Sequence, residues 1–143
     1  MSSLPAGPRV AIGLAITAVG VALATLGARG ALQAAASMQV VALPAGLAFV
    51  FAGALMLLPE RLASLRLPLG ALMVTSLALV FDWVAFGPGE RQFTGSLSVS
   101  GGAAASAPVG ETAGRVFFGL FALLFDIAAI GLWLRLIRGV RSQ

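Results

Sequence analysis

The chain of 143 residues contains no histidine, no cysteine and no tyrosine, and it has no lysine either. The missing cysteines exclude disulfides, thiolate nucleophiles and soft-metal sites, and the missing histidines remove the commonest metal ligand and the general base best matched to pH 7. Asp, Glu, Arg, Ser and Thr remain, and no nucleophile among them has a base placed beside it. We therefore expect no catalytic, metal or cofactor site, and we expect that the protein is not an enzyme.

Charge is also scarce. Only 10% of the residues are charged and 59% are hydrophobic, whereas soluble domains carry about 25% charge. Four apolar runs of 19 or 20 residues cover 10–28, 40–58, 67–86 and 116–134, and each is long enough for a bilayer core of roughly 30 Å. The sequence predicts an all-α integral membrane protein in which 1–143 forms a single domain, an antiparallel bundle of four transmembrane helices. The first run exceeds the apolar length of a signal peptide, so we interpret it as a retained helix.

The nine arginines predict the orientation of the chain. With both termini in the cytoplasm, six arginines lie inside and three outside, in agreement with the positive-inside rule. We therefore expect a multi-pass protein of the bacterial inner (plasma) membrane, with a cytoplasmic tail at 135–143 and contacts to membrane lipids. The net charge of +4 does not indicate nucleic-acid binding, because the arginines form no patch or stripe. The inner arginines are Arg9, Arg61, Arg66, Arg135, Arg138 and Arg141, and the outer ones are Arg29, Arg91 and Arg115.

The third connection, predicted as an outer loop at 87–115, is much longer than the first two. A loop of 29 residues is uncommon unless it is functional or disordered. Phe93, Leu97 and Val99 alternate with polar residues between glycines, which is typical of a short strand or β-hairpin, and the following AAASAPVGETAG is typical of a loop. We regard these three apolar residues as candidates for docking a partner.

Small residues recur at spacings of four and three along the apolar runs. In lipid, helices associate through close packing of small residues and a few hydrogen bonds, so each recurrence predicts a packing face. The second run has a weaker face, in which Phe49 interrupts Ala42, Gly46 and Gly53. The other faces consist of Gly13, Thr17, Gly20, Ala24 and Gly27; of Ala71, Thr75, Ala78, Asp82 and Ala85; and of Gly119, Ala122, Asp126 and Ala129.

Asp82 and Asp126 are the acids inside the apolar runs. An ionised carboxylate at the middle of a bilayer costs at least about 2.5–3.5 kcal/mol, so both residues need an explanation. Counting inward from the outer helix ends at about 1.5 Å per residue places Asp126 near the midplane and Asp82 nearer the outer surface. For Asp126 we expect either structural hydrogen bonding between helices or a role as a proton or cation carrier, and for Asp82 an interfacial ion pair or a hydrogen bond at a helix end. The predicted layers are Asp126 with Thr75 and Thr17, and Asp82 with Thr25 and either Arg115 or Arg29.

Two further features lie in and before the last apolar run. Glu111 and Arg115 are four residues apart and are expected to form a surface ion pair of little energy. An aromatic stripe beside the small-residue face is either bulk that faces lipid or a docking surface for another membrane subunit or a lipidic cofactor. The stripe consists of Phe117, Phe118, Phe121 and Phe125.

These features leave two functions open. The first is a non-catalytic structural or accessory subunit of a larger inner-membrane complex, which docks on other membrane subunits or on itself. The second is a small proton- or ion-coupled transporter or channel that works as an oligomer through Asp126.

Overall fold

The computed structural model describes the backbone of residues 6–32, 37–88, 93–99 and 103–141, and the side chains of 7–30, 41–88 and 110–139. The elements follow one another as four long helices, with a 3-10 turn before the third and two strands before the fourth. They are α1 (Ala6–Leu32), α2 (Ser37–Leu57), η1 (Glu60–Leu65), α3 (Arg66–Phe86), β1 (Phe93–Val99), β2 (Ala103–Val109) and α4 (Glu111–Arg141).

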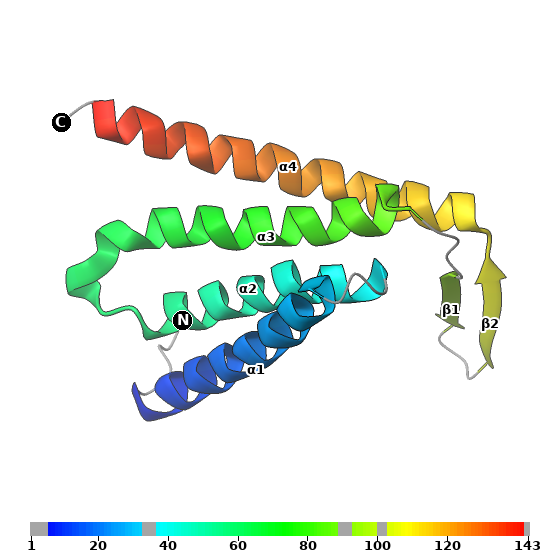
Figure 1. Ribbon diagram of the computed structural model, residues 1–143, viewed down its shortest axis with the longest axis horizontal. Coiled ribbons are helices and arrows are strands. Elements are labelled where there is room, and N and C mark those ends of the chain that lie inside the picture. Colours follow the sequence, from blue (N-terminus) through cyan, green and yellow to red (C-terminus); the bar gives the residue numbers. More distant parts are fainter. Residues whose placement is uncertain (1–5, 33–36, 89–92, 100–102, 142–143) are drawn as a thin grey trace.

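The four helices lie in a row in chain order (Figure 1). Extensive contacts join α1 to α2, α2 to α3 and α3 to α4, so α4 forms one edge of the row. Within the described residues, three helical stretches are long and apolar enough to cross a membrane, and α2 contributes a shorter apolar stretch over Val41–Leu57. The arrangement is consistent with a helical membrane protein. The start of α1, η1 and the end of α4 lie at one end of the row, which we call the arginine-rich end (Figure 1).

Helix α4 is longer than the sequence predicts. It begins at Glu111 rather than at residue 116, and it continues to Arg141. The negative charge of Glu111 in its first turn interacts favourably with the positive end of the helix dipole. The Gly114 amide donates a hydrogen bond to the Gly110 carbonyl oxygen at 3.0 Å, which closes the first turn. The prediction that the outer loop extends to residue 115 is therefore wrong, because helix formation continues beyond the apolar run.

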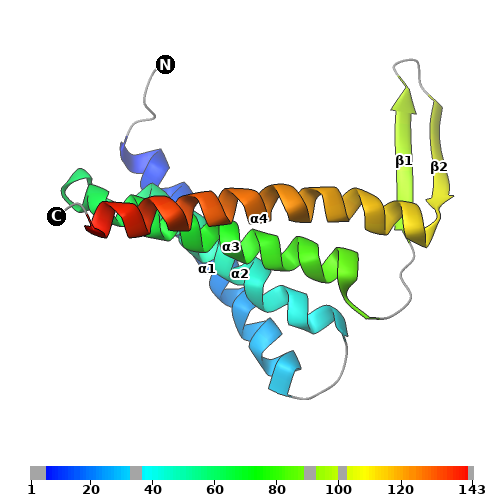
Figure 2. The same cartoon turned by 90° about the horizontal axis from the view of Figure 1, so that it is seen from above.

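The two strands pair antiparallel, in a register that runs from Phe93 opposite Val109 to Val99 opposite Ala103. Strand β2 therefore lies in the segment that the sequence indicates as loop, and its pairing with β1 accounts for the extended backbone. The strands project at the end of the row where α4 begins (Figure 2). The docking candidates Phe93, Leu97 and Val99 are in β1, and their side chains lie outside the described residues.

Helices α1 and α2 pack backbone to backbone through glycines. Gly13, Gly20 and Gly27 on α1 are buried, as are Gly46 and Gly53 on α2. A Cβ added at Gly20 would lie 2.6 Å from the Val50 nitrogen and 2.7 Å from the Gly46 carbonyl oxygen. The seven-residue spacing of the glycines on each helix keeps one face toward the partner over several turns. The small-residue face expected for α1 is thus the face that packs on α2.

Alanines take the corresponding role between α3 and α4. Ala71, Ala78 and Ala85 of α3 are buried, as are Ala122 and Ala129 of α4, again at seven-residue spacing. A Cβ added at Gly119 would meet the Ala85 Cβ at 3.8 Å, which is ordinary van der Waals contact. The α3–α4 interface therefore has room for a methyl group at this position, whereas the α1–α2 interface has none at its buried glycines.

Candidate functional site

Different kinds of side chain flank the two sides of the α3–α4 contact. The buried alanines at its centre, which we call the alanine seam, are Ala71, Ala78, Ala85, Ala122 and Ala129. Each residue turns a helix by about 100°, so Phe81 and Asp82 of α3 lie on opposite sides of Ala78 and Ala85. On one side Phe81 stacks on aromatic rings of α4, and we call this side the aromatic edge. The other side, which we call the polar edge, carries Asp82, Thr75, Arg115, Asp126 and Trp133.

The aromatic edge accounts for most of the predicted aromatic stripe. The Phe81 ring centroid lies 6.2 Å from that of Phe118, 5.8 Å from that of Phe121 and 5.0 Å from that of Phe125. Phe117 packs edge-on to Phe118 at 5.6 Å and is 56% exposed. The stripe therefore packs on α3 through Phe81, and only its outer margin, with Phe117, is largely free for lipid or a partner.

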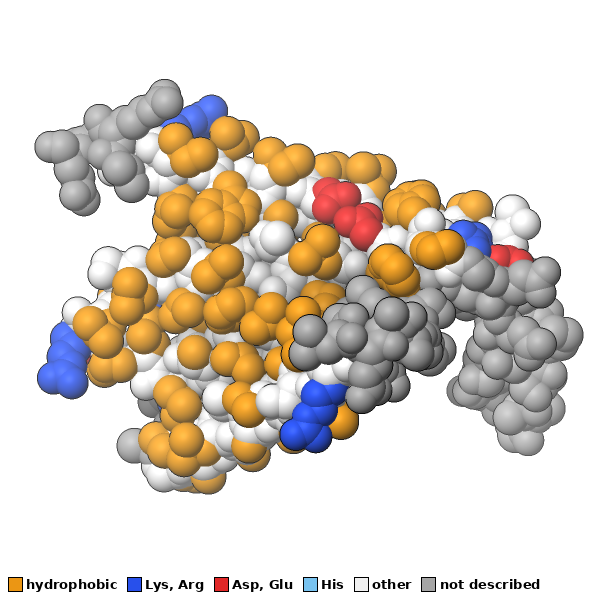
Figure 3. All heavy atoms as spheres, viewed as in Figure 1, with side chains coloured by type: hydrophobic (Ala, Val, Ile, Leu, Met, Phe, Trp, Pro, Cys, Tyr) orange, Lys and Arg blue, Asp and Glu red, His pale blue; other side chains and the backbone are white. Residues whose placement is uncertain are grey.

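The polar edge brings Asp82 and Asp126 together. Because Ala85 lies beside Gly119, the two acids are about four residues apart along the helix axes, or roughly 6 Å. Helical side chains tilt toward their own N-terminus, so in this antiparallel pair Asp82 and Asp126 lean toward each other. Two ionised carboxylates at this separation repel each other in a medium of low dielectric constant. In Figure 3 acidic side chains lie together among hydrophobic ones where α3 and α4 meet.

Neither carboxylate is neutralised inside the described part of the chain. Both acids are half-buried, and the ion pair found among the described side chains joins Arg115 to Glu111 instead. Asp82 and Asp126 also receive no hydrogen bond from Thr17, Thr25 or Thr75, because each threonine hydroxyl donates to a carbonyl of its own helix.

The two predicted polar layers are therefore not formed as expected. Thr17 lies on the α1–α2 interface, where its hydroxyl donates to the Gly13 carbonyl oxygen at 2.8 Å and would collide with a Cβ at Gly53. Thr25 is exposed and donates to the Ala22 carbonyl at 2.8 Å. Grouping residues by equal depth in the membrane is valid only if all four helices contact one another. In the row of helices, α1 with Thr17 and Thr25 is separated from α4 with Asp126.

Thr75 binds a tryptophan rather than Asp126. The Trp133 indole Nε1 donates to the Thr75 hydroxyl oxygen at 3.1 Å, while that hydroxyl donates to the Ala71 carbonyl at 2.8 Å. Trp133 lies near the end of the last apolar run, where a tryptophan commonly lies at the membrane surface. Its tilt toward the N-terminus of α4 carries the indole into the interface instead, where the N–H needs a protein acceptor in the absence of water.

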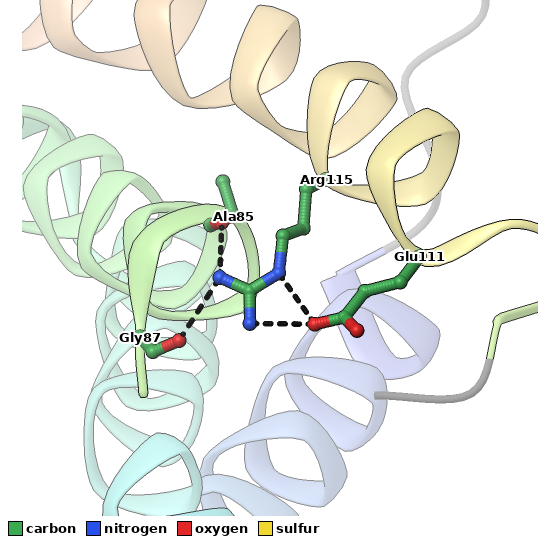
Figure 4. Close-up of polar contacts among 4 residues, drawn as sticks. All are labelled: Ala85, Gly87, Glu111 and Arg115. Atoms are coloured by element: carbon green, nitrogen blue, oxygen red, sulfur yellow. Dashed lines mark hydrogen bonds and ion pairs between the residues drawn. The ribbon is translucent and has the colours of Figure 1, made fainter. Parts of the chain in front are cut away.

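Arg115 joins the start of α4 to the end of α3 (Figure 4). Its side chain pairs with Glu111, at 2.8 Å from Nη2 and 2.9 Å from Nε, which confirms the predicted ion pair. Its Nη1 also donates to the carbonyl oxygens of Ala85 at 3.4 Å and Gly87 at 3.3 Å. The last carbonyls of a helix have no partner within it, so a cation there satisfies them and complements the helix dipole.

A second arginine acts in the same way at the arginine-rich end. The Arg9 Nε on α1 donates to the Met56 carbonyl oxygen, in the last turn of α2, at 2.9 Å. The α1–α2 pair and the α3–α4 pair thus each have an arginine near the start of one helix that donates to carbonyls at the end of the other. Counting arginines as topology signals misses this role, because the partner carbonyls belong to a different helix.

No protein family, curated protein or solved structure matches the chain.

Proposed function

We propose that the protein is a non-catalytic accessory subunit of a larger membrane complex, with both termini in the cytoplasm of a bacterial cell and the two strands on the outer side. The observation that carries the proposal is the edge position of α4. Within the described residues α4 packs extensively on α3 alone, and its half-buried Asp126 borders apolar side chains that are more than half exposed. Lipid can cover apolar side chains, whereas a carboxylate in a membrane span usually pairs with another protein group.

The arginines in the described part of the chain support the proposed orientation. The arginine-rich end, which holds the start of α1, η1 and the end of α4, contains Arg9, Arg61, Arg66, Arg135 and Arg138. Arg29, near the end of α1, and Arg115, near the start of α4, belong to the opposite end. Positively charged residues accumulate on the cytoplasmic side of membrane proteins. The arginine-rich end is therefore assigned to the cytoplasm, where anionic lipid headgroups would contact its guanidinium groups.

The test is purification of the full-length chain from its native membrane in a mild detergent, followed by native mass spectrometry. An accessory subunit should carry one or more other membrane chains in fixed stoichiometry. A chain recovered alone, in detergents that preserve known complexes of the same membrane, contradicts the proposal.

A second candidate function is a small proton- or ion-coupled transporter, and the adjacent carboxylates of Asp82 and Asp126 favour it. Carboxylates inside a span are a common means of carrying protons across membranes. If the protein is such a transporter, the interior of liposomes containing the purified chain should acidify when a proton gradient is imposed. Asp126→Asn should abolish this proton flux while leaving helicity unchanged. Liposomes with no flux above that of protein-free controls contradict it.

A further inference from the structure

The polar edge of the α3–α4 interface opens onto an apolar surface. Leu79 lies three residues before Asp82, and Leu123 and Ile130 lie three before and four after Asp126, so all three share the helical faces of the acids. Each of these apolar side chains is more than half exposed. In a bilayer this surface would contact hydrocarbon, and the two half-buried carboxylates would lie within it.

Hydrocarbon cannot screen the repulsion between two carboxylates that are about one helical turn apart. A cation beside both of them removes the repulsion and supplies the missing ion pairs. Arg115 is held by Glu111 and by the carbonyls of Ala85 and Gly87, so its guanidinium is directed to the end of α3. The neutralising group must therefore come from outside the described part of α3 and α4.

A second copy of the chain is a poor source of that cation. The chain has no lysine, and none of its arginines lies within the four apolar runs. A copy in the same orientation would place its own carboxylates, rather than a cation, at this depth.

We propose that the polar edge docks a transmembrane helix of a different protein, and that this helix carries a lysine or arginine inside its apolar span, where it pairs with Asp82 and Asp126. This inference rests on the proposed function, and it specifies the chemistry of the partner. Leu79, Leu123 and Ile130 form the apolar margin against which the rest of that helix packs. The basic residue should lie about 10 Å from the outer end of its apolar span, between the depths of the two acids counted at about 1.5 Å per residue.

A designed peptide tests the pairing without knowledge of the native partner. The probe is a Leu/Ala-rich transmembrane peptide with a dansyl label and a single lysine about 10 Å from one end of its apolar span, and the control peptide has leucine at that position. Both are reconstituted with the full-length chain in phosphatidylcholine vesicles, and energy transfer from Trp83 and Trp133 reports association. We expect the lysine peptide to half-saturate at a concentration at least about tenfold lower than the leucine peptide does. This ratio corresponds to a difference in binding free energy of about 1.4 kcal/mol.

Variants of the chain identify the acids as the origin of this preference. The double variant Asp82→Asn with Asp126→Asn should reduce the preference for the lysine peptide to less than about twofold. Asp126→Asn alone should give a preference between these two ratios. Glu60→Gln, which changes an exposed acid in η1, should leave it unchanged. Circular dichroism confirms that each variant is helical, and the comparison of the two peptides on the unaltered chain requires no variant at all.

Three results overturn the inference. The first is equal binding of the lysine and leucine peptides, and the second is a lysine preference that persists in the double variant. The third concerns the native complex: a partner chain that co-purifies equally with the unaltered chain and with the double variant leaves the proposed function intact and refutes the pairing.

Discussion

An alanine at Gly46 of α2 tests the glycine packing between α1 and α2. The added Cβ would lie 2.6 Å from the Gly20 carbonyl oxygen and 2.8 Å from the Ala24 Cα, and the Ala24 nitrogen would also be in contact. These are backbone atoms, so no side-chain rotation relieves the contacts. Ordinary van der Waals contact begins at 3.4 Å, and the helices must therefore move apart by at least about 0.8 Å.

The expected cost follows from this displacement. A gap of 0.5–1 Å loses roughly a quarter to a half of the dispersion energy of each contact that spans it, and overpacking typically costs about 1–3 kcal/mol. We expect Gly46→Ala to lower the free energy of unfolding by about 2 kcal/mol, even though alanine favours the helix by about 1 kcal/mol over glycine. Gly20→Ala combined with Gly46→Ala should cost less than the sum of the two, because the first displacement makes room for the second Cβ.

Gly131 on α4 provides the matched control. A Cβ there meets nothing within 4 Å, so Gly131→Ala should leave the stability unchanged or raise it by up to about 1 kcal/mol. The assay is equilibrium unfolding in increasing mole fractions of SDS, with Förster transfer between labels at the ends of α1 and α2 as the probe. Equal stability of Gly46→Ala and Gly131→Ala, with unchanged transfer in the folded state, would refute the close packing of α1 and α2.

Three further tests concern the α3–α4 interface. Arg115→Gln should weaken the capping of the α3 end and lower the unfolding free energy by about 1 kcal/mol, and hydrogen exchange should accelerate in the last turn of α3; unchanged exchange there contradicts the capping role. Phe81→Leu should cost about 1–3 kcal/mol because it removes three ring contacts, whereas Phe117→Leu on the exposed side should cost less than about 0.5 kcal/mol; equal losses in SDS unfolding contradict the aromatic edge. A double-mutant cycle of Trp133→Phe and Thr75→Val should give a coupling of about 0.6 kcal/mol, and a coupling of zero excludes the indole–hydroxyl bond as a stabilising contact.

The sequence predicts those features that depend on one helix at a time. Composition and run length are enough to identify four apolar helices, since the bilayer thickness sets the length of a span. The spacing of Gly13, Gly20 and Gly27 predicts a packing face, since a close helix contact in lipid requires small residues. The pair of Glu111 and Arg115 follows from helical periodicity alone.

Features that depend on how two helices are aligned were not predictable in this way. Depths counted from the ends of apolar runs placed Asp82 and Asp126 in separate layers, because the count could not include the register between α3 and α4 or the tilt of the side chains. The same counting grouped Asp126 with Thr17, although α1 and α4 are separated by the rest of the row. Equal depth in a membrane implies proximity only when the neighbours of each helix are known.

The identity of the small residue on each seam determines which interface is open to a partner. Glycines let α1 and α2 touch along their backbones, so little space remains beside that seam for other side chains. Alanines leave more room between α3 and α4, and the residues that flank them divide into an aromatic edge and a polar edge. Because Ala78, Ala85 and Ala122, together with Phe81 and its ring contacts, hold these helices together, Asp82 and Asp126 are not required for that contact. The acids are therefore free to pair with a cation from another chain without loosening the interface that presents them.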